Sequence, residues 1–442
     1  MTRTLRNNAW TLAAIGLAGA ALLACDSEGT STLSGGAHTY TPVESPAASA
    51  GASTATGTSG SGNGMVVTTP AAGGVTPGTG GTTGNTGADP TAASNANISG
   101  RQVNYGEALR TASLKLLGDL PTIAQIDQMA ITLDPTAQAT LYASFVDQFL
   151  ADPRFSAKMI QYWRDTLKTG QQGAPVTGVP SFDTAATYAA EVVVNDMPLT
   201  SIFTATSGTC PTFANGTFEP ADCGNNAPTT GILTDPGLMS QYYSNMAFRR
   251  VRFLQETFVC SKFPAEFSAK SVPMGVGAYT SPWDFDSIAG GPTAKINFQD
   301  TSSIICADCH TTMNHMAPLF GNFDANGQYI STGYQVQVPV IGTPMATLAD
   351  WLPPGQPFAW RNGTSVTDLP SLGQAIAADP DVAMCAVNRI WDFAMSRGDI
   401  VNDLATVPPV VTQQFATDFT ANGMSMKKLI REVFTSTDFV SF

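Results

Sequence analysis

The chain has little charge and very little histidine. Of its 442 residues only 12% are Asp, Glu, Lys or Arg, and three are His. Acidic side chains outnumber basic ones by 34 to 21, which gives a formal net charge of −13. A protein that binds nucleic acid needs clusters of Lys and Arg to neutralise phosphates, so this composition excludes nucleic acid as a partner. No phosphate-binding loop or Ser-His-Asp set supports a self-contained enzyme, and whether the chain catalyses a reaction stays open.

Long apolar runs are missing after the first 24 residues, so we expect no transmembrane helix in the mature chain. The run 10–24 is apolar, is too short to span a bilayer comfortably, and follows Arg3 and Arg6, as in a secretory signal peptide. It ends in the tetrapeptide LLAC, which resembles a bacterial lipobox. We expect residues 1–24 to be a signal peptide and Cys25 to be lipidated. A plain cleaved signal peptide is the alternative.

Residues 25–100 have almost no side chains that could build a core. Gly, Ala, Ser and Thr account for 53 of the 75 residues from 26 to 100, and Lys and Arg are absent there. Such a segment cannot bury enough apolar surface to offset the entropy of ordering it. The sequence therefore predicts a disordered tether. Its lipid would anchor the protein to the inner or outer membrane of the cell envelope, facing the periplasm or the cell surface.

Helical periodicity dominates the remainder of the chain. Six segments show it: 122–132, 137–150, 153–167, 237–260, 380–397 and 425–434. Strand-like alternation appears only in 329–340, just after the tight-turn pair Asn326-Gly327, whereas 208–231 and 264–292 have the composition of long loops. The sequence predicts a mainly α fold. Its parts are a helical region at 101–263, a loop-rich connection at 264–294 and a second helical module with a small β-hairpin at 295–442.

One motif has clear chemical content: Cys306-Ala307-Asp308-Cys309-His310. Cys-x-x-Cys-His is the attachment signature of haem c, in which both thiols form thioethers with the porphyrin and the histidine is an axial iron ligand. We therefore expect one covalent haem c, held by Cys306 and Cys309, with His310 as the proximal ligand, and a helical cytochrome c-like module at 295–442. Two alternatives are a thioredoxin-like redox pair, which would need a βαβ setting, and a zinc site, which would need a second pair of ligands.

The sequence CADCHTTMNHMAPLFGNFDANGQY resembles the haem segment of exported bacterial proteins related to the planctomycete-type cytochrome c domains. Six residues match the pattern of that family position for position: Met313, Asn322, Phe323, Asp324, Gly327 and Tyr329. Weaker similarity extends over much of residues 101–442. The activity of that family is largely undescribed, so the resemblance implies a haem c protein without implying a reaction.

The sixth iron ligand separates electron transfer from reaction at the iron. His315 follows His310 by five residues and would point away from the iron on one helix, and His38 lies in the tether. A Met/His pair is the natural alternative, and we expect the distal ligand to be Met345, in a Pro-rich loop after the predicted hairpin. Met384 and Met395 are other candidates, and an open distal site is a further possibility.

Four cysteines remain outside the motif and the lipobox. In an oxidising compartment they most simply form two disulfides, and we expect the pairs Cys210–Cys223 and Cys260–Cys385. The first pair would close one loop and the second would join the two helical regions. Buried free thiols are the alternative.

The sequence therefore predicts a monohaem c-type cytochrome lipoprotein that carries electrons at the bacterial cell envelope. A haem enzyme, either a peroxidase or an oxidoreductase module, is one alternative. An envelope lipoprotein with a binding or structural role and a vestigial haem module is another. The redox partner protein is unknown, and the membrane is contacted only through the N-terminal lipid.

Overall fold

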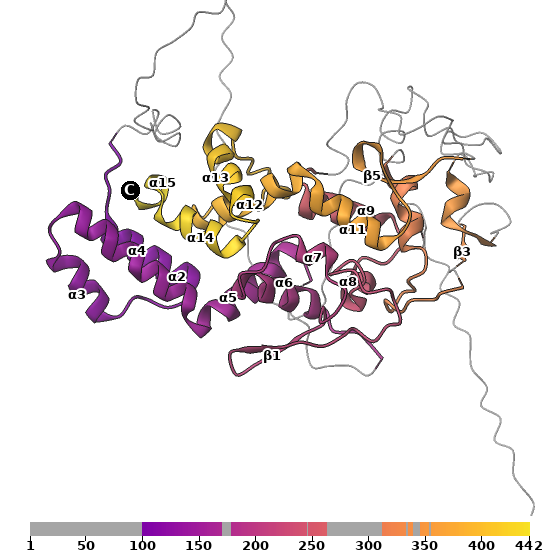
Figure 1. Cartoon of the computed structure of the whole chain (residues 1–442), viewed down its shortest axis with the longest axis horizontal. Coiled ribbons are helices and arrows are strands. Elements are labelled where there is room, and N and C mark those ends of the chain that lie inside the picture. The colour runs from indigo at the N-terminus through magenta and orange to yellow at the C-terminus, as the bar shows by residue number, and fades with distance from the viewer. Residues whose placement is uncertain are drawn as a thin grey trace, which may run out of the picture. The chain divides into compact units, whose positions relative to one another are not determined.

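The computed structural model describes residues 100–169, 178–244, 246–262, 312–332, 335–338, 345–352 and 355–442. These parts are mainly helical, and their strands form three two-stranded antiparallel sheets, so the predicted mainly α class is confirmed (Figure 1). The expected signal peptide, the expected connection 264–294 and residues 25–99 of the expected tether lie outside the described residues. Within the described residues, no helix combines the length and the apolarity needed to cross a membrane.

Four helices open the described chain: α2 (Tyr105–Leu116), α3 (Ile123–Ile131), α4 (Pro135–Ala151) and α5 (Pro153–Leu167). Their starts follow from local chemistry. Thr122 forms a capping box with Gln125 at α3, and the Asp134 and Asp152 side chains accept backbone N–H groups at α4 and α5. Proline occupies the first position of α4 and α5, where its missing N–H costs nothing.

The middle of the chain has four helices and one hairpin: α6 (Thr184–Val194), α7 (Ser201–Thr204), β1 (Thr212–Ala214), β2 (Thr217–Glu219), α8 (Pro236–Gln241) and α9 (Phe248–Phe258). Helix α6 is enclosed on nearly all sides, because nine of its eleven residues are buried. The segment 237–260, expected as one helix, is two. The break falls at Ala247, whose φ of 54° is left-handed.

After residue 311 the chain alternates short turns and strands before returning to helix. The elements are η3 (Ala317–Phe320), β3 (Val336–Gln337), β4 (Met345–Ala346), η4 (Leu348–Trp351), β5 (Phe358–Trp360), η5 (Arg361–Gly363), β6 (Thr364–Val366), α11 (Leu369–Ala378), α12 (Pro380–Ala394), α13 (Pro409–Ala421), α14 (Met426–Thr435) and α15 (Thr437–Val440). The strand β3 pairs with β4, and β5 pairs with β6.

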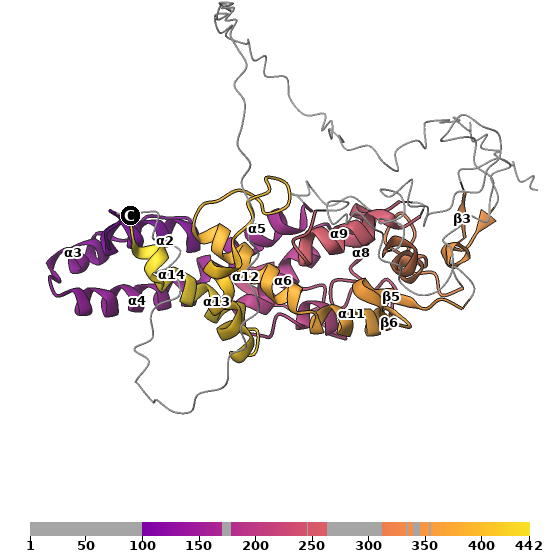
Figure 2. The ribbon, with the colours of Figure 1, turned by 90° about the horizontal axis from the view of Figure 1, so that it is seen from above.

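The beginning and the end of the described chain pack together. Helix α14 lies against α4, and α15 lies against α2 (Figures 1 and 2). The Gln102 N–H donates to the Phe442 carbonyl at 2.9 Å, and the Tyr142 hydroxyl donates to the Phe434 carbonyl at 2.7 Å. One cluster of buried apolar residues therefore includes both the first and the last helices.

Two loop and strand expectations need correction. The segment 208–231, expected as an irregular loop, contains the β1–β2 hairpin. Of the strand expected over 329–340, the described residues show β3, whose two residues pair with β4, and residues 333, 334, 339 and 340 lie outside the described residues. At the start of the range, Tyr329 forms an isolated antiparallel bridge with Phe323 and donates its N–H to the carbonyl of Asn225.

Candidate functional site

The residues expected to hold haem, Cys306, Cys309 and His310, lie outside the described residues, as does Cys25. The described chain resumes at Thr312, two residues after His310, with α-helical residues 312–316 leading into η3. The structure therefore shows how the segment that follows the motif is held against the rest of the protein.

Arg250 in α9 fixes this segment by its backbone. The side chain is buried, with 1% of the residue exposed. Its guanidinium donates to the carbonyls of Phe320, Phe323 and Asp324 at 3.0 to 3.1 Å, and twice to the carbonyl of Met239, at 2.7 and 3.0 Å. Burial lowers the pKa of Arg250 to about 10, so the group stays charged at neutral pH. One cation thus ties α9 and α8 to the turn after η3.

The turn at residues 324–328 is fixed from the other side by Asn225. Its amide donates to the carbonyl of Gly327 at 3.1 Å, and its carbonyl accepts the N–H of Tyr329 at 3.2 Å. Gly327 has a φ of 70°, and a Cβ added there would lie 2.0 Å from the carbonyl oxygen of Pro236. The Asp324 carboxylate accepts two backbone N–H groups of the turn. The expected tight turn at Asn326-Gly327 is therefore confirmed.

The His315 side chain has a hydrogen-bond partner within the protein. It is buried, and its Nδ1 lies 2.6 Å from the carbonyl of Pro357. Since a carbonyl can only accept, Nδ1 carries the proton. Burial lowers the pKa of His315 despite this hydrogen bond, which favours the neutral ring. The contact places the helical residues 312–316 directly against the strand β5 region.

The three methionines considered for the distal position differ in exposure. Met345 begins β4, and 56% of the residue is exposed. Met384 and Met395 are partly buried and pack against the hydrophobic core, where the Thr412 hydroxyl donates to the sulfur of Met384 at 3.8 Å. Among these three, Met345 is the most exposed residue.

Both expected cysteine pairs lie at disulfide distance. The sulfur atoms of Cys210 and Cys223 are 1.95 Å apart and those of Cys260 and Cys385 are 2.02 Å apart. The first bond closes the loop that contains the β1–β2 hairpin, and the second joins the end of α9 to α12. The other three of the seven cysteines, Cys25, Cys306 and Cys309, lie outside the described residues.

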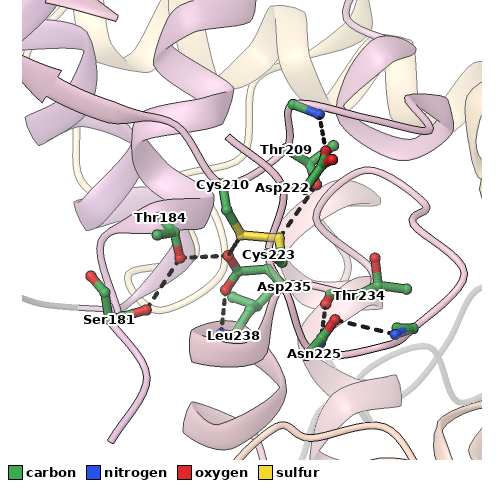
Figure 3. Close-up of a disulfide and its surroundings, with 12 residues drawn as sticks. Ser181, Thr184, Thr209, Cys210, Asp222, Cys223, Asn225, Thr234, Asp235 and Leu238 are labelled. Carbon is green, nitrogen blue, oxygen red and sulfur yellow. Dashed lines mark hydrogen bonds between the residues drawn. A yellow bond between two sulfur atoms is a disulfide. The ribbon is translucent and has the colours of Figure 1, made fainter. Parts of the chain in front are cut away.

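A buried carboxyl group faces the first disulfide (Figure 3). Asp235 Oδ2 lies 3.4 Å from Cys210 Sγ and 2.5 Å from the Thr184 hydroxyl, and Oδ1 accepts the N–H of Leu238 at 2.7 Å as the N-cap of α8. Complete burial raises the pKa of Asp235 to about 6, although the hydrogen bonds from Thr184 and the start of α8 oppose the shift.

A polar cleft of about 310 Å³ lies between α5 and α12. Its central carboxylate, Asp399, is 3.0 Å from Lys168 Nζ and 3.5 Å from the Arg389 guanidinium. Burial opposes ionisation of Asp399, but hydrogen bonds from Asn402 and Lys168 and the charge of Arg389 hold its pKa at about 2. The charges of this cleft largely neutralise one another, which favours a structural junction over a ligand site.

Sequence reasoning did not find Arg250 or Asp235. Arg250 occupies an apolar position of an amphipathic helix, so an unusual arginine on the buried face of α9 was the available signal. Asp235 precedes Pro236 in the pattern of a helix N-cap, and that pattern says nothing of the disulfide beside it.

Comparisons with models of protein families, with curated proteins and with solved structures find no match. The functional argument therefore depends on the residues of this chain.

Proposed function

We propose that the chain is a monohaem c-type cytochrome that carries electrons at the bacterial cell envelope. The observation that supports it best is the sequence Cys306-Ala307-Asp308-Cys309-His310, which combines two thiols and an imidazole at the spacing of haem c attachment. Bound haem would supply one-electron chemistry at its iron.

The chemistry of the available donors fits this cofactor. Cys210, Cys223, Cys260 and Cys385 are taken up by disulfides, so the pairing leaves the thiols of Cys306 and Cys309 available for thioethers. Of the three histidines, His38 lies in the predicted tether and His315 contacts the carbonyl of Pro357. These observations favour His310 as the axial ligand.

The fixed segment after the motif suits an electron carrier. Arg250, Asn225 and Gly327 fix the backbone from η3 to Tyr329, so the chain just beyond His310 is tied to the core. A firmly held ligand keeps the coordination of the iron similar in its two oxidation states, and this lowers the reorganisation that accompanies electron transfer.

The proposal extends to the location of the protein. A lipid on Cys25 and a tether over 25–100 would hold the folded part near the membrane, so that a partner redox protein of the envelope could approach it. The membrane would be contacted only through this lipid.

Covalent attachment is tested on protein produced in a host that matures c-type cytochromes. The chain should keep a haem stain on a denaturing gel and give the pyridine spectrum of haem c at one haem per chain, because thioethers survive denaturation. Cys306→Ser with Cys309→Ser should abolish both signals. The matched control, Cys210→Ala with Cys223→Ala, should retain them. A wild-type chain that stays colourless after maturation would refute the proposal.

The distal ligand is tested by replacing Met345. If its sulfur binds iron, the oxidised wild type is low-spin and shows the weak long-wavelength charge-transfer band of Met/His haems. Met345→Ala should remove that band, admit cyanide and carbon monoxide, and lower the potential by on the order of 0.1 V, within the ~0.8 V range that axial ligands span. Met384→Ala and Met395→Ala should retain the band. A wild type that is already high-spin and binds these ligands readily would favour a haem enzyme over an electron carrier.

A further inference from the structure

The disulfide Cys210–Cys223 lies between a buried acid and the protein surface. Cys210 is 8% exposed and its sulfur contacts the fully buried Asp235. Cys223 is half-buried in a loop, between the exposed residues Asp222 and Gly224. An incoming thiolate can therefore approach the sulfur of Cys223 from the loop side, and Cys210 is then the leaving group.

The hydrogen bonds around Asp235 indicate where a proton resides. The Thr184 hydroxyl lies 2.5 Å from Asp235 Oδ2 and 3.2 Å from the carbonyl oxygen of Ser181 (Figure 3). The Thr184 hydroxyl has one hydrogen, so it can donate to only one of these two oxygens at a time. Both contacts become good hydrogen bonds when Asp235 is protonated on Oδ2 and donates to Thr184, which in turn donates to Ser181.

The charged surroundings of Asp235 do not supply a counter-ion. Among the residues that the structure describes, no Lys or Arg lies within ion-pair distance of its carboxyl group, and Arg164, near the start of α6, is paired with Asp183 at 2.8 Å. Asp222, beside Cys223, accepts the N–H of Gly208. Burial without a nearby cation raises the pKa of Asp235 to about 6, which agrees with a proton on Oδ2 in mildly acidic conditions.

The protonation state of Asp235 affects how easily the sulfur of Cys210 leaves. When Cys210 leaves as a thiolate, an ionised Asp235 would place a second negative charge 3.4 Å away in a buried site. That repulsion raises the pKa of the leaving thiol and slows its departure. A protonated Asp235 removes the repulsion and can transfer its proton to the sulfur.

We propose that Cys210–Cys223 is a reducible disulfide, opened by a dithiol that attacks Cys223 while Asp235 delivers a proton to Cys210. A thiolate of the dithiol forms a bond to the sulfur of Cys223, the bond between Cys223 and Cys210 breaks, and the Cys210 sulfur takes the proton from Asp235 Oδ2. The second thiolate of the dithiol then attacks its own mixed disulfide and releases Cys223, which is protonated from water. The dithiol is oxidised by two electrons, and the protein gains two electrons and one proton from water, because the proton on Cys210 comes from Asp235.

Opening of this bond would release the β1–β2 hairpin from its covalent closure, because both strands lie between the two cysteines. The buried contact of Cys210 with α8, through Asp235, would become a hydrogen bond between a thiol and a carboxylate. This inference does not depend on haem, since none of the participating residues belongs to the motif.

The experiment measures reduction of the full-length protein by dithiothreitol between about pH 5 and about pH 9, with the thiolate concentration held constant. Alkylation at timed points, followed by mass spectrometry, follows each disulfide separately. We expect the opening rate of Cys210–Cys223 to fall about tenfold per pH unit above about pH 6, because only the protonated form of Asp235 assists. The Cys260–Cys385 bond, which contacts backbone carbonyls of Thr257 and Cys385, is the internal reference and should show no such fall.

Two variants identify the group that causes the pH dependence of the opening rate. Asp235→Asn keeps the oxygen that caps α8 but cannot titrate, so its profile should be flat. Asp222→Asn removes the exposed acid beside Cys223 and should keep the wild-type fall. A flat profile in the wild type would overturn the proposal, as would a fall that persists in Asp235→Asn. Whether the opening rate of Cys210–Cys223 falls with pH is decided in the wild type by comparison with Cys260–Cys385, even if a variant folds poorly.

Discussion

At the scale of single residues, the buried cation Arg250 makes the largest number of side-chain hydrogen bonds described above, and sequence reasoning did not find it. Arg250 replaces an apolar residue on the buried face of α9 and satisfies four carbonyl oxygens that come from α8 and from the segment 320–324. The carbonyls of Phe320 and Asp324 also accept the backbone N–H groups of Phe323 and Gly327, and the Arg250 guanidinium adds further donors to these buried oxygens. One arginine in a distant helix therefore helps to fix the position of this turn.

Replacement of Arg250 should lower the stability of the protein strongly. Arg250→Ala removes the guanidinium hydrogen bonds to four buried carbonyl oxygens, and we expect the free energy of unfolding to fall by about 3 to 5 kcal/mol. Arg250→Lys should recover only part of this loss, because an ammonium group cannot reach carbonyls in several directions. Urea unfolding followed by circular dichroism measures the change. Arg252→Ala, which removes an exposed ion pair with Glu256 on the same helix, should change stability by less than about 1 kcal/mol. Equal losses for Arg250→Ala and Arg252→Ala would contradict this role.

Asp235 should make stability depend on pH. Burial raises its pKa from the ordinary value of 3.8 to about 6 in the folded protein. Between these two values the folded state holds the proton more tightly than the unfolded chain, so stability is highest below about pH 4 and falls as the pH rises to about 6. The fall amounts to roughly 3 kcal/mol for a shift of about two units.

The contribution of Asp235 is isolated by comparison with Asp235→Asn, because Asp392 and Glu432 also have pKa values raised by burial, to about 6 and about 7. Unfolding of both proteins by urea at a series of pH values gives the difference in stability at each pH. The difference should change in favour of the variant as the pH rises through this window. A difference that is constant from about pH 4 to about pH 7 would contradict the assignment.

At the scale of elements, local signals explain which helices could be predicted. The Asp152-Pro153 pair fixes the start of α5, and Ser425 fixes the start of α14, where its hydroxyl accepts the Lys428 N–H. Helix α6 was missed because it is buried on nearly all sides and so lacks an alternation of apolar and polar faces. At the start of the strand expected over 329–340, the Tyr329 N–H bonds to Asn225, a contact that depends on the tertiary fold, and Tyr329 pairs only with Phe323 in an isolated bridge.

The capping box of α3 offers a test at this scale. The Gln125 N–H donates to the Thr122 hydroxyl oxygen at 3.2 Å, and the Gln125 side chain accepts the Thr122 N–H at 2.9 Å. Thr122→Ala removes the acceptor and should lower the stability of α3 by about 1 kcal/mol. Since Met129 is the only buried residue of α3, the effect should appear as faster amide hydrogen exchange within that helix. Thr122→Ser keeps a hydroxyl and should exchange like the wild type. Similar acceleration in both variants would show that the cap is unimportant.

At the scale of the whole molecule, the two disulfides connect different parts of the fold: Cys210–Cys223 closes one loop, and Cys260–Cys385 joins the end of α9 to α12. Cysteine number and compartment predicted both pairings, because four cysteines in an oxidising setting leave few arrangements and two of the four bracket one loop. The environment of each bond could not be predicted, because Asp235 and Cys210 are brought together only by packing of α8 against the loop. The haem ligands remain a sequence prediction, since their residues lie outside the described parts.

The sequence separations predict how much each disulfide stabilises the fold. Cys260 and Cys385 are 125 residues apart, whereas Cys210 and Cys223 are 13 apart. In the chain-entropy model, loss of the longer closure costs about 5 kcal/mol and loss of the shorter one about 3 kcal/mol. Paired Cys→Ala variants, compared by urea unfolding, measure both values. A larger loss for the Cys210 and Cys223 variant would show that contacts of that bond outweigh loop length.

The attachment of the whole chain to a membrane is the last property to test. The apolar run 10–24 and the sequence LLAC predict a diacylated Cys25, and no helix among the described residues could serve as a membrane span. Cys25→Ser should therefore release the protein to the soluble fraction or leave it unprocessed, because the variant cannot carry the proposed lipid. Fractionation of cells and the mass of the N-terminal peptide measure partition and lipidation together. Ser27→Ala, a change two residues away that leaves the thiol in place, should stay with the membrane. If Cys25→Ser is cleaved after residue 24 and still partitions like the wild type, lipidation is not the anchor.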